Sequence, residues 1–499
     1  MDIIDAALSS LNLLLTYDVM IMLCIGVIYG LCVGLMPGLG GIVAIALLLP
    51  FTIGFGVIPT LGLLLGAHIA TIWGGSVTSI LFNVPGAAKS LALVFDGHPM
   101  TRNGQASRAL GASAMAALLG GIIGAIFLAL SIPLVRPIML SIGPSEYLIL
   151  ALWGLSIIAT FSDGSMIKGG IATCLGMMAA YVGMDPITGT PRFWMDSIYL
   201  LDGIYFPVAM IGLFAISEML KLYVKQTSFV ERVEGEETST LLSGCMDAFK
   251  HWWLVIRSSL LGLWIGVLPG IGASVGGIAA YAQAVQTSKN PEKFGKGAVE
   301  GVIAPDATLG ANEGGGLLPT LAFGIPGGES MAILLVAFLS MGIVPGPQML
   351  TTDLDLVFAM VWIIVFANIF TAIIGLAISP KLSKLPGLNP NIMIPIVLSV
   401  CLFGAYVTRG YFADVILAFL FGVIGYYMDK YKFSRANFVI GMVLAEMIER
   451  NLHISLGLHG NYFIFTQPVS IFLLFLLFLT TGLSLKRKNS KKEQLSVQN

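Results

Sequence analysis

The sequence has few charged residues. Only 11% of its 499 residues are Asp, Glu, Lys or Arg, whereas soluble proteins carry about 25%. Because a chain of this length needs far more charge to cover a water-exposed surface, this shortage excludes a soluble multidomain protein. With 57% hydrophobic residues, the composition instead predicts an all-α polytopic membrane protein.

Basic charge and ordered cysteines are also lacking. The 26 Lys and Arg residues balance 27 Asp and Glu residues, so no basic field is present to hold nucleic acid. The five cysteines are scattered and form no CxxC pattern or Cys/His cluster, which argues against a disulfide framework or a structural metal. A cleaved signal peptide needs a basic segment near its start. Since no Lys or Arg precedes Lys89, we expect no such signal peptide.

Catalytic motifs are missing as well. No GxxxxGK[ST] sequence occurs, so we expect neither ATP hydrolysis by this chain nor an associated ATPase. GxSxG, HExxH and paired catalytic carboxylates are absent too, and we therefore expect no enzyme, no cofactor and no bound metal.

Apolar runs long enough to cross a bilayer occur along the whole chain. Two regions, residues 36–95 and 269–344, are apolar but interrupted by Gly and Pro. Including these regions, we expect about 11–14 transmembrane helices. The uninterrupted runs are residues 19–35, 109–135, 147–161, 167–184, 198–220, 253–267, 356–379, 392–407, 411–427 and 469–485.

One hydrophilic insert, residues 221–250, divides the chain. We call residues 1–220 the first half and residues 251–485 the second half. The tail, residues 486–499, is basic. By the positive-inside rule, the tail and the insert lie in the cytoplasm.

The two Gly- and Pro-rich regions resemble each other. Residues 30–40 read GLCVGLMPGLG and residues 262–272 read GLWIGVLPGIG, an offset of 232. Further along, Gly74-Gly75, Phe82 and Pro85-Gly86 match Gly315-Gly316, Phe323 and Pro326-Gly327 at an offset of 241. The sequence therefore predicts an internal repeat.

Loop charge predicts that the two copies have opposite orientations. The loop after the first copy is basic, with Arg102 and Arg108, whereas the loop after the second is acidic, with Asp353 and Asp355. An inverted pair of repeats with broken helices is typical of secondary transporters that bind substrate at the membrane midplane. The alternative is that the GxxxG spacing only packs helices, but packing does not explain the prolines in register with the glycines.

Four helix breaks or re-entrant segments are expected at the Pro-Gly motifs, in residues 36–41, 85–86, 268–273 and 325–328. A helix that restarts there presents free N–H groups and the positive end of its dipole, which attract anions. The hydroxyl and amide side chains beside the breaks are neutral hydrogen-bond donors, which suit a carboxylate that must bind reversibly. The candidate substrate-binding residues are Gly38, Gly40, Ser76, Thr78, Ser79, Asn83, Pro85, Gly86, Lys89, Gly270, Gly272, Ser274, Asn312, Thr320, Pro326, Gly327 and Ser330.

Few charged residues lie inside these regions, and such residues are functional candidates by default. Asp306, Glu313 and Glu329 are candidates for binding a coupling Na⁺ or H⁺. Two interpretations of Lys89 stay open, namely pairing with a substrate carboxylate and extending to the cytoplasmic face. Asp306 is alternatively a cap at the end of a loop. For His68 we favour a packed, hydrogen-bonded role over a place in the site.

Several motifs then point to a known family. They are GGSVTSILFNVPG (residues 74–86), DGHPMTRNGQASRALG (96–111), EGVIAPDA (300–307), LLPTLAFGIPG (317–327) and GIVPGPQML (342–350). With both PGxG breaks, they resemble the large permease subunit of the tripartite tricarboxylate transporters.

This resemblance implies a carrier in the cytoplasmic membrane of a prokaryote that takes up di- or tricarboxylates such as citrate. It implies cation symport by alternating access, a small membrane subunit of about four spans, and an extracytoplasmic solute-binding protein. It also implies that residues 74–85 and 312–326 line the transport site. The sequence departs from the family pattern at Lys89, Glu313 and Glu329.

Alternative functions stay open at this point. One is a secondary carrier for another small anion that works without a binding protein. The others are a channel and a membrane-embedded enzyme that acts on an anionic or lipid substrate.

Overall fold

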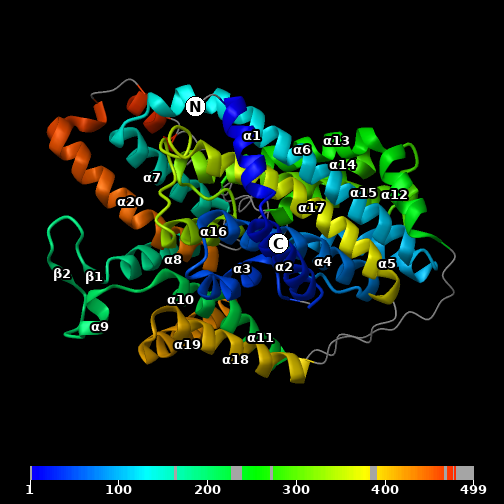
Figure 1. Cartoon of the computed structure of the whole chain (residues 1–499), viewed down its shortest axis with the longest axis horizontal. Coiled ribbons are helices and arrows are strands. Elements are labelled where there is room, and N and C mark those ends of the chain that lie inside the picture. The colour runs from blue at the N-terminus through cyan, green and yellow to red at the C-terminus, as the bar shows by residue number, and fades with distance from the viewer. Residues whose placement is uncertain are drawn as a thin grey trace, which may run out of the picture. The chain divides into compact units, whose positions relative to one another are not determined.

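The computed structural model describes residues 3–36, 38–161, 166–225, 239–269, 273–382, 390–465, 469–475 and 477–478. These residues are almost entirely helical, with one two-stranded hairpin (Figure 1). They form two compact units. The first unit comprises residues 1–135 and 206–426, and the second comprises residues 136–205 and 427–499.

The first unit contains most of the helices. They are α1 (Ile3–Leu14), α2 (Tyr17–Gly34), α3 (Gly41–Leu48), η1 (Leu49–Thr52), α4 (Val57–Phe82), η2 (Ala88–Leu93), α5 (Val94–Arg102), most of α6 (Ala106–Leu140), α10 (Phe206–Met210), η3 (Ile211–Ile216), α11 (Ser217–Lys225), α12 (Leu241–Lys250), α13 (Trp252–Val267), α14 (Ala273–Thr287), η4 (Pro291–Lys293), α15 (Glu300–Phe323), α16 (Glu329–Ser340), α17 (Leu354–Leu382), α18 (Pro390–Arg409) and most of α19 (Phe412–Lys430).

The second unit contains α7 (Pro144–Phe161), α8 (Met166–Ala180), strands β1 (Gly183–Met184) and β2 (Pro191–Arg192), α9 (Ile198–Leu201), α20 (Arg435–His459) and η5 (Gly460–Phe465). Its long helix α20 packs closely against α8 at Gly176. A Cβ at this position would lie 1.9 Å from the carbonyl oxygen of Phe438. Strands β1 and β2 pair antiparallel, and Arg192 ties them to α20 by an ion pair with Glu449 at 2.6 Å.

Helices end and restart at all four Pro-Gly motifs. Helix α2 ends at Gly34 and α3 begins at Gly41, while α4 ends at Phe82 and η2 begins at Ala88. In the second half, α13 ends at Val267 and α14 begins at Ala273, while α15 ends at Phe323 and α16 begins at Glu329. Pro37 and residues 270–272 lie outside the described residues. The predicted breaks are thus present, whereas their re-entrant path through a membrane stays a prediction.

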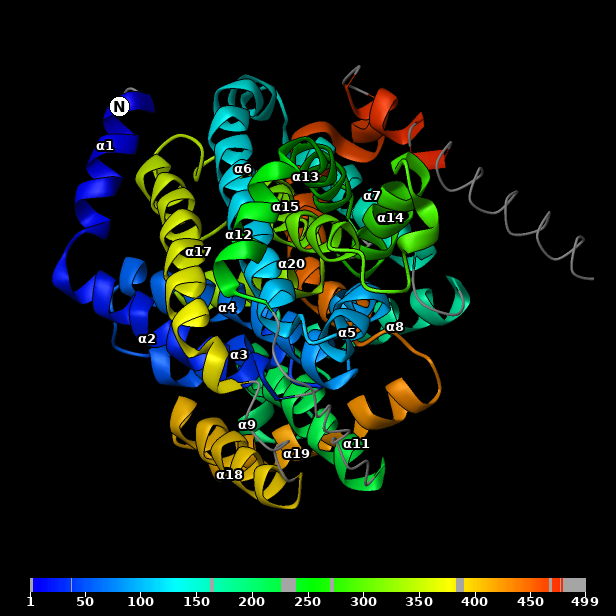
Figure 2. The ribbon, with the colours of Figure 1, turned by 90° about the vertical axis from the view of Figure 1, so that its right-hand side faces the viewer.

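The contacts of the two sequence copies repeat as well. Gly30 of α2 packs on Ala67 of α4, where a Cβ would lie 2.1 Å from the Ala67 carbonyl oxygen. Gly262 of α13 packs on Thr308 of α15 in the same way, at 2.3 Å. Ala67 and Thr308 are 241 residues apart, which is the offset of the second motif. In both views α2 lies with α3 and α4, and α13 lies with α14 and α15 (Figures 1 and 2).

The helix ends also correspond. Helix α4 ends with Asn83 in the left-handed conformation at φ 55°, and α15 ends with Gly324 at φ 66°. These two positions are again 241 residues apart. The left-handed conformation stops a helix and redirects the chain, so both copies use the same device just before the Pro-Gly pair.

Seven described helices are long and apolar enough to cross a membrane, and five shorter apolar helices accompany them. The chain is therefore a helical, multi-pass membrane protein. The predicted total of about 11–14 spans and the opposite orientation of the repeats stay predictions. So does the division into halves at the insert, since each compact unit draws on residues from both sides of it.

Candidate functional site

A buried carboxylate of the second half lies between two basic groups of the first half. Glu313 of α15 contacts His68 of α4, with 2.7 Å between Oε2 and Nε2. Its other oxygen lies 3.7 Å from Nζ of Lys89 in η2. The side chains of His68, Glu313 and Lys89 are only 1%, 6% and 14% exposed. We call these three residues the charged cluster.

The start of α3 packs directly on this cluster. A Cβ at Gly41, the first residue of α3, would lie 2.2 Å from Nδ1 of His68. Only glycine lets the helix approach so closely. The positive end of the α3 dipole is therefore held beside the imidazole.

A second buried carboxylate joins the same two helices. Asp306 of α15 is fully buried, and its Oδ1 accepts a hydrogen bond from Oγ of Ser76 in α4 at 2.7 Å. Its Oδ2 has no hydrogen-bond partner among the described residues. The structure thus brings together two pairs of candidates that are far apart in sequence, Ser76 with Asp306 and Lys89 with Glu313.

The other buried hydroxyl groups among the candidate residues form hydrogen bonds within their own copy of the repeat. Thr78 and Ser79 both donate to the carbonyl oxygen of Gly75. Thr320 donates to the carbonyl oxygen of Gly316 and accepts from the N–H of Gly327 at 3.3 Å. These contacts stabilise the ends of α4 and α15.

The candidate glycines permit close backbone packing at the breaks. A Cβ at Gly86 would lie 2.4 Å from Cα of Gly75, and one at Gly327 would lie 2.6 Å from Cα of Gly316. Gly38, at φ 87°, donates its N–H to the carbonyl oxygen of Gly86 at 3.1 Å. The two breaks of the first half are therefore hydrogen-bonded to each other, and a Cβ at Gly40 would lie 3.3 Å from Cβ of Ala87.

Other candidates lie closer to the surface of the structure. Glu329 and Asn83 are exposed, and Glu329 is near enough to act on the charge of Lys89. The left-handed conformation of Asn83 gives it a structural role at the end of α4. Pro85, Ser274, Asn312 and Ser330 are partly exposed, and Pro326 is buried. Gly270 and Gly272 lie outside the described residues.

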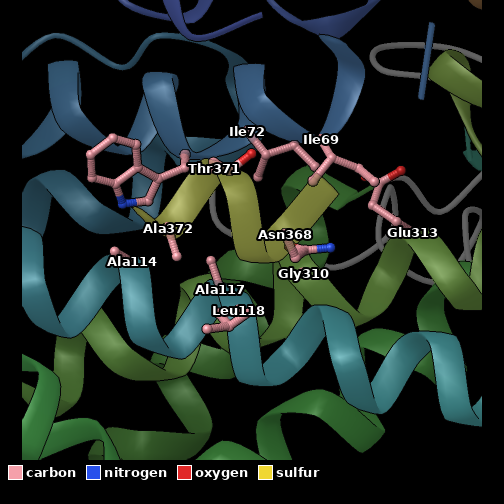
Figure 3. A pocket seen from close by; sticks show the side chains of 11 residues that line it. Ile69, Ile72, Ala114, Ala117, Leu118, Gly310, Glu313, Asn368, Thr371 and Ala372 are labelled. Carbon is pink, nitrogen blue, oxygen red and sulfur yellow. The ribbon is translucent and has the colours of Figure 1, made fainter. Parts of the chain in front are cut away.

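A small cavity opens beside Glu313 (Figure 3). It lies between α4, α6, α15 and α17, and measures about 10 Å³, which is room for about one water molecule. Asn368 and Thr371 of α17 contribute polar groups to its wall. In this conformation the cavity therefore holds no larger ligand.

Two residues near Glu313, Asn368 and Thr371, were not among the sequence candidates, and the partner of His68 was not predicted. His68 was expected to be packed and hydrogen-bonded, as it is, but its partner is the candidate Glu313. Asn368 and Thr371 line the cavity but lie in residues 356–379, which the sequence predicts as an uninterrupted apolar span. The available signal was their i, i+3 spacing, which places two polar side chains on one face of an apolar helix. Across the described part of the chain, no three His, Cys, Asp or Glu side chains are arranged to hold a metal ion.

Comparisons with known proteins agree with the sequence motifs. The family model described as "Tripartite tricarboxylate transporter TctA family" matches residues 20–440. A protein of Agrobacterium vitis, "Uncharacterized 52.8 kDa protein in TAR-I ttuC' 3'region", is 29% identical over 452 residues, which is 90% of each chain. Another A. vitis protein, "Uncharacterized protein in TAR-II ttuC' 3'region", is 29% identical over 237 residues, 47% of this chain and 98% of that protein. No solved structure matches the chain.

Proposed function

The chain belongs to the tripartite tricarboxylate transporter TctA family, and we propose that it is the large permease subunit of a carboxylate carrier. The carrier takes up di- or tricarboxylates such as citrate by symport with Na⁺ or H⁺. The observation that carries this proposal is the charged cluster, in which Glu313 of one repeat holds Lys89 of the other at 3.7 Å.

The cluster is suited to exchange one carboxylate for another. In the structure, Glu313 occupies the position beside the Lys89 ammonium that a substrate carboxylate would take. The start of α3 is packed against His68 and adds the positive end of a helix dipole. A substrate that enters between the repeats releases Lys89 from Glu313 and weakens the contact between the two halves. Binding and rearrangement of the repeats are then coupled, as alternating access requires.

The packing of α4 on α15 supports an inverted repeat. His68 meets Glu313, and eight residues later in α4 Ser76 meets Asp306, seven residues earlier in α15. The two helices therefore run antiparallel. Since they occupy equivalent positions in the two copies, an axis in the membrane plane that relates the copies would produce this arrangement.

Contacts in the second unit support the proposed orientation. Lys168, at the start of α8, donates to the carbonyl oxygen of Tyr431 at 2.7 Å, beside the basic residues Lys430, Lys432 and Arg435. Arg192 meets Glu449 farther along α20. We place the basic residues at the start of α20, the insert (residues 221–250) and the tail (residues 486–499) in the cytoplasm. The hairpin of β1 and β2 then lies outside the cell, on the face where a solute-binding protein delivers substrate. A small membrane subunit completes the complex in the cytoplasmic membrane of a prokaryote.

Reconstitution tests the proposed activity. Proteoliposomes that contain this chain and its small partner subunit should accumulate labelled citrate only under an inward gradient of Na⁺ or H⁺. Accumulation that persists after both gradients are collapsed would overturn the proposed symport.

A lysine variant tests the site. Lys89→Gln removes a charge-assisted contact worth about 1.5–3 kcal/mol, so we expect labelled citrate uptake to fall by about 10- to 100-fold. Lys250→Gln is the matched control, because the Lys250 side chain is 68% exposed, and its uptake should equal that of the wild type. Equal uptake by both variants would place the substrate site elsewhere. A second pair, Asn83→Ala and Asn312→Ala, should reduce uptake while the protein stays in the membrane.

A further inference from the structure

We propose that Asp306 binds the coupling ion and that this ion is a proton, so that the protein is a carboxylate:H⁺ symporter. This inference rests on the proposed function and deepens it. It separates the two buried carboxylates of α15, because Glu313 is held by His68 and Lys89, whereas none of the described residues forms an ion pair with Asp306.

The surroundings of Asp306 require that its charge be neutralised. It is fully buried, and among the described residues its side chain interacts with two neutral hydroxyl groups, those of Ser76, at 2.7 Å, and Ser113. An isolated carboxylate in such a place is strongly destabilised unless it binds a cation or a proton. Its unpartnered Oδ2 is the atom that such a cation or proton would occupy.

The charged groups nearby do not serve as that cation. Among the described residues, none of the titratable groups on the elements packed against α15 forms an ion pair or hydrogen bond with Asp306. These groups are His68 on α4, Asp96, His98 and Arg102 on α5, Arg108 on α6, Arg257 on α13, Tyr281 on α14, Glu329 on α16, Asp355 and Lys381 on α17, and Lys89 on η2. Asp96 instead accepts from the N–H groups of Gly297 and Ala298 at 2.8 and 2.9 Å.

The packing of α6 on α15 favours a proton over Na⁺. A Cβ at Gly120 would lie 2.2 Å from the carbonyl oxygen of Ala307, the residue after Asp306. A Cβ at Gly310, one turn later, would lie 2.4 Å from the carbonyl oxygen of Ala117. Such close contact on the α6 side of Asp306 restricts the room for the shell of oxygens that a metal cation needs. A proton adds a hydrogen-bond donor and almost no volume.

A hydroxyl group is in place to accept that proton's hydrogen bond. Ser113 lies one turn before Ala117 in α6, just as Asp306 lies one turn before Gly310 in α15, and the two side chains interact. The Ser113 Oγ is buried, and in the described part of the chain it makes no hydrogen bond of ordinary geometry. A protonated Oδ2 can donate to this oxygen, which satisfies both atoms without adding a charge.

The position of Asp306 links the proton to the substrate. Asp306 and Glu313 are seven residues apart on α15, which is about 10 Å along the helix. Each is joined to α4, one through Ser76 and the other through His68. Movement of α4 against α15 therefore opens both contacts together. The proton binds Oδ2 from the outer side and leaves to the cytoplasm when the repeats have rearranged.

The test uses Asp306→Asn, which resembles the protonated acid in shape and is always neutral. In Na⁺-free proteoliposomes with the small partner subunit, the wild type should accumulate labelled citrate under a pH gradient that is alkaline inside. The variant should lose at least ten-fold of this uptake. Its exchange of internal for external citrate at equal pH should stay within about two-fold of the wild type, because exchange needs no proton release. Asp18→Asn is the matched control, since Asp18 is exposed, and it should keep both activities.

Ser76→Ala gives a second test that does not depend on the folding of the first variant. The Ser76 hydroxyl stabilises the carboxylate more than the neutral acid, since hydrogen bonds to charged groups are stronger. Removing it should therefore move the pH midpoint of uptake upward, while the exchange rate at low pH is retained. An unchanged midpoint would count against the role of Asp306.

The other outcomes are equally decisive. If a Na⁺ gradient alone drives citrate uptake, the proton assignment is wrong while the proposed carrier function stands. Undiminished pH-driven uptake by Asp306→Asn, or loss of exchange together with uptake, also overturns the assignment. If the wild type neither exchanges nor accumulates citrate or the other di- and tricarboxylates, the proposed function fails first and the proton assignment fails with it.

Discussion

The strongest energetic prediction concerns the pair of Lys89 and Glu313. Nζ and Oε1 are 3.7 Å apart, and at an effective dielectric constant of 20 two unit charges at that distance attract by about 4.5 kcal/mol. Removing one partner of a buried pair costs about 3–5 kcal/mol, because the other charge is left uncompensated. We therefore expect Glu313→Gln to lower the free energy of unfolding by that amount.

The partner variant should cost less. After Lys89→Met, Glu313 still contacts His68 at 2.7 Å, and protonation of that imidazole supplies the missing positive charge. The double variant removes both charges. Its loss of stability should be smaller than the sum of the single losses by about 2–3 kcal/mol.

Reversible unfolding in mixed micelles with increasing SDS, followed by Trp fluorescence, measures these free energies. The matched control is the pair of Lys250 and Asp247, which lie 3.5 Å apart with the Lys250 side chain 68% exposed. Its coupling energy in the cycle of Lys250→Met and Asp247→Asn should stay below about 1 kcal/mol. If the coupling of Lys89 with Glu313 is no larger than that of the control, the reasoning from burial is refuted.

Two further predictions concern packing and pH. Gly120→Ala should destabilise the protein by about 1–3 kcal/mol, because its Cβ would lie 2.2 Å from the Ala307 carbonyl oxygen; Gly170→Ala, with nothing within 4 Å, is the neutral control in the same unfolding assay. The hydrogen bond with Glu300 raises the pKa of His251 above 6.5, and the same bond lowers the pKa of Glu300 below 4.5. The pair therefore stabilises the fold fully between these two pH values. That contribution fades as pH rises through the raised pKa of His251 or falls through the lowered pKa of Glu300. Since both side chains are 33% exposed, it should be under about 1 kcal/mol; a melting temperature whose pH profile is unchanged by Glu300→Gln would contradict it.

The breaks were predictable because their signal is local. A Pro-Gly pair that recurs at a constant offset can be read from the sequence, and helices do end at each pair. Proline alone is a poorer guide, since α15 continues through Pro305 and Pro319 and ends only at the left-handed Gly324. Neighbouring helices can compensate the hydrogen bond that a single proline removes in a membrane protein. A left-handed residue, in contrast, redirects the chain.

The pairing of charges was not predictable from one sequence. His68 and Glu313 are 245 residues apart, and their contact depends on how α4 packs against α15. The same holds for Ser76 with Asp306. Both carboxylates were marked as candidates because ionisable groups are rare in apolar segments. Among the described residues, Glu313 is held by two basic groups and Asp306 by none, and this difference appears only once the packing is known.

A structure of the protein with bound citrate would show whether Lys89 and the helix breaks form the substrate site. We expect a citrate carboxylate within hydrogen-bond distance of Nζ of Lys89, between the breaks of the two repeats, with Glu313 displaced from that ammonium. Density for citrate away from the breaks, with Lys89 and Glu313 still in contact, would contradict it.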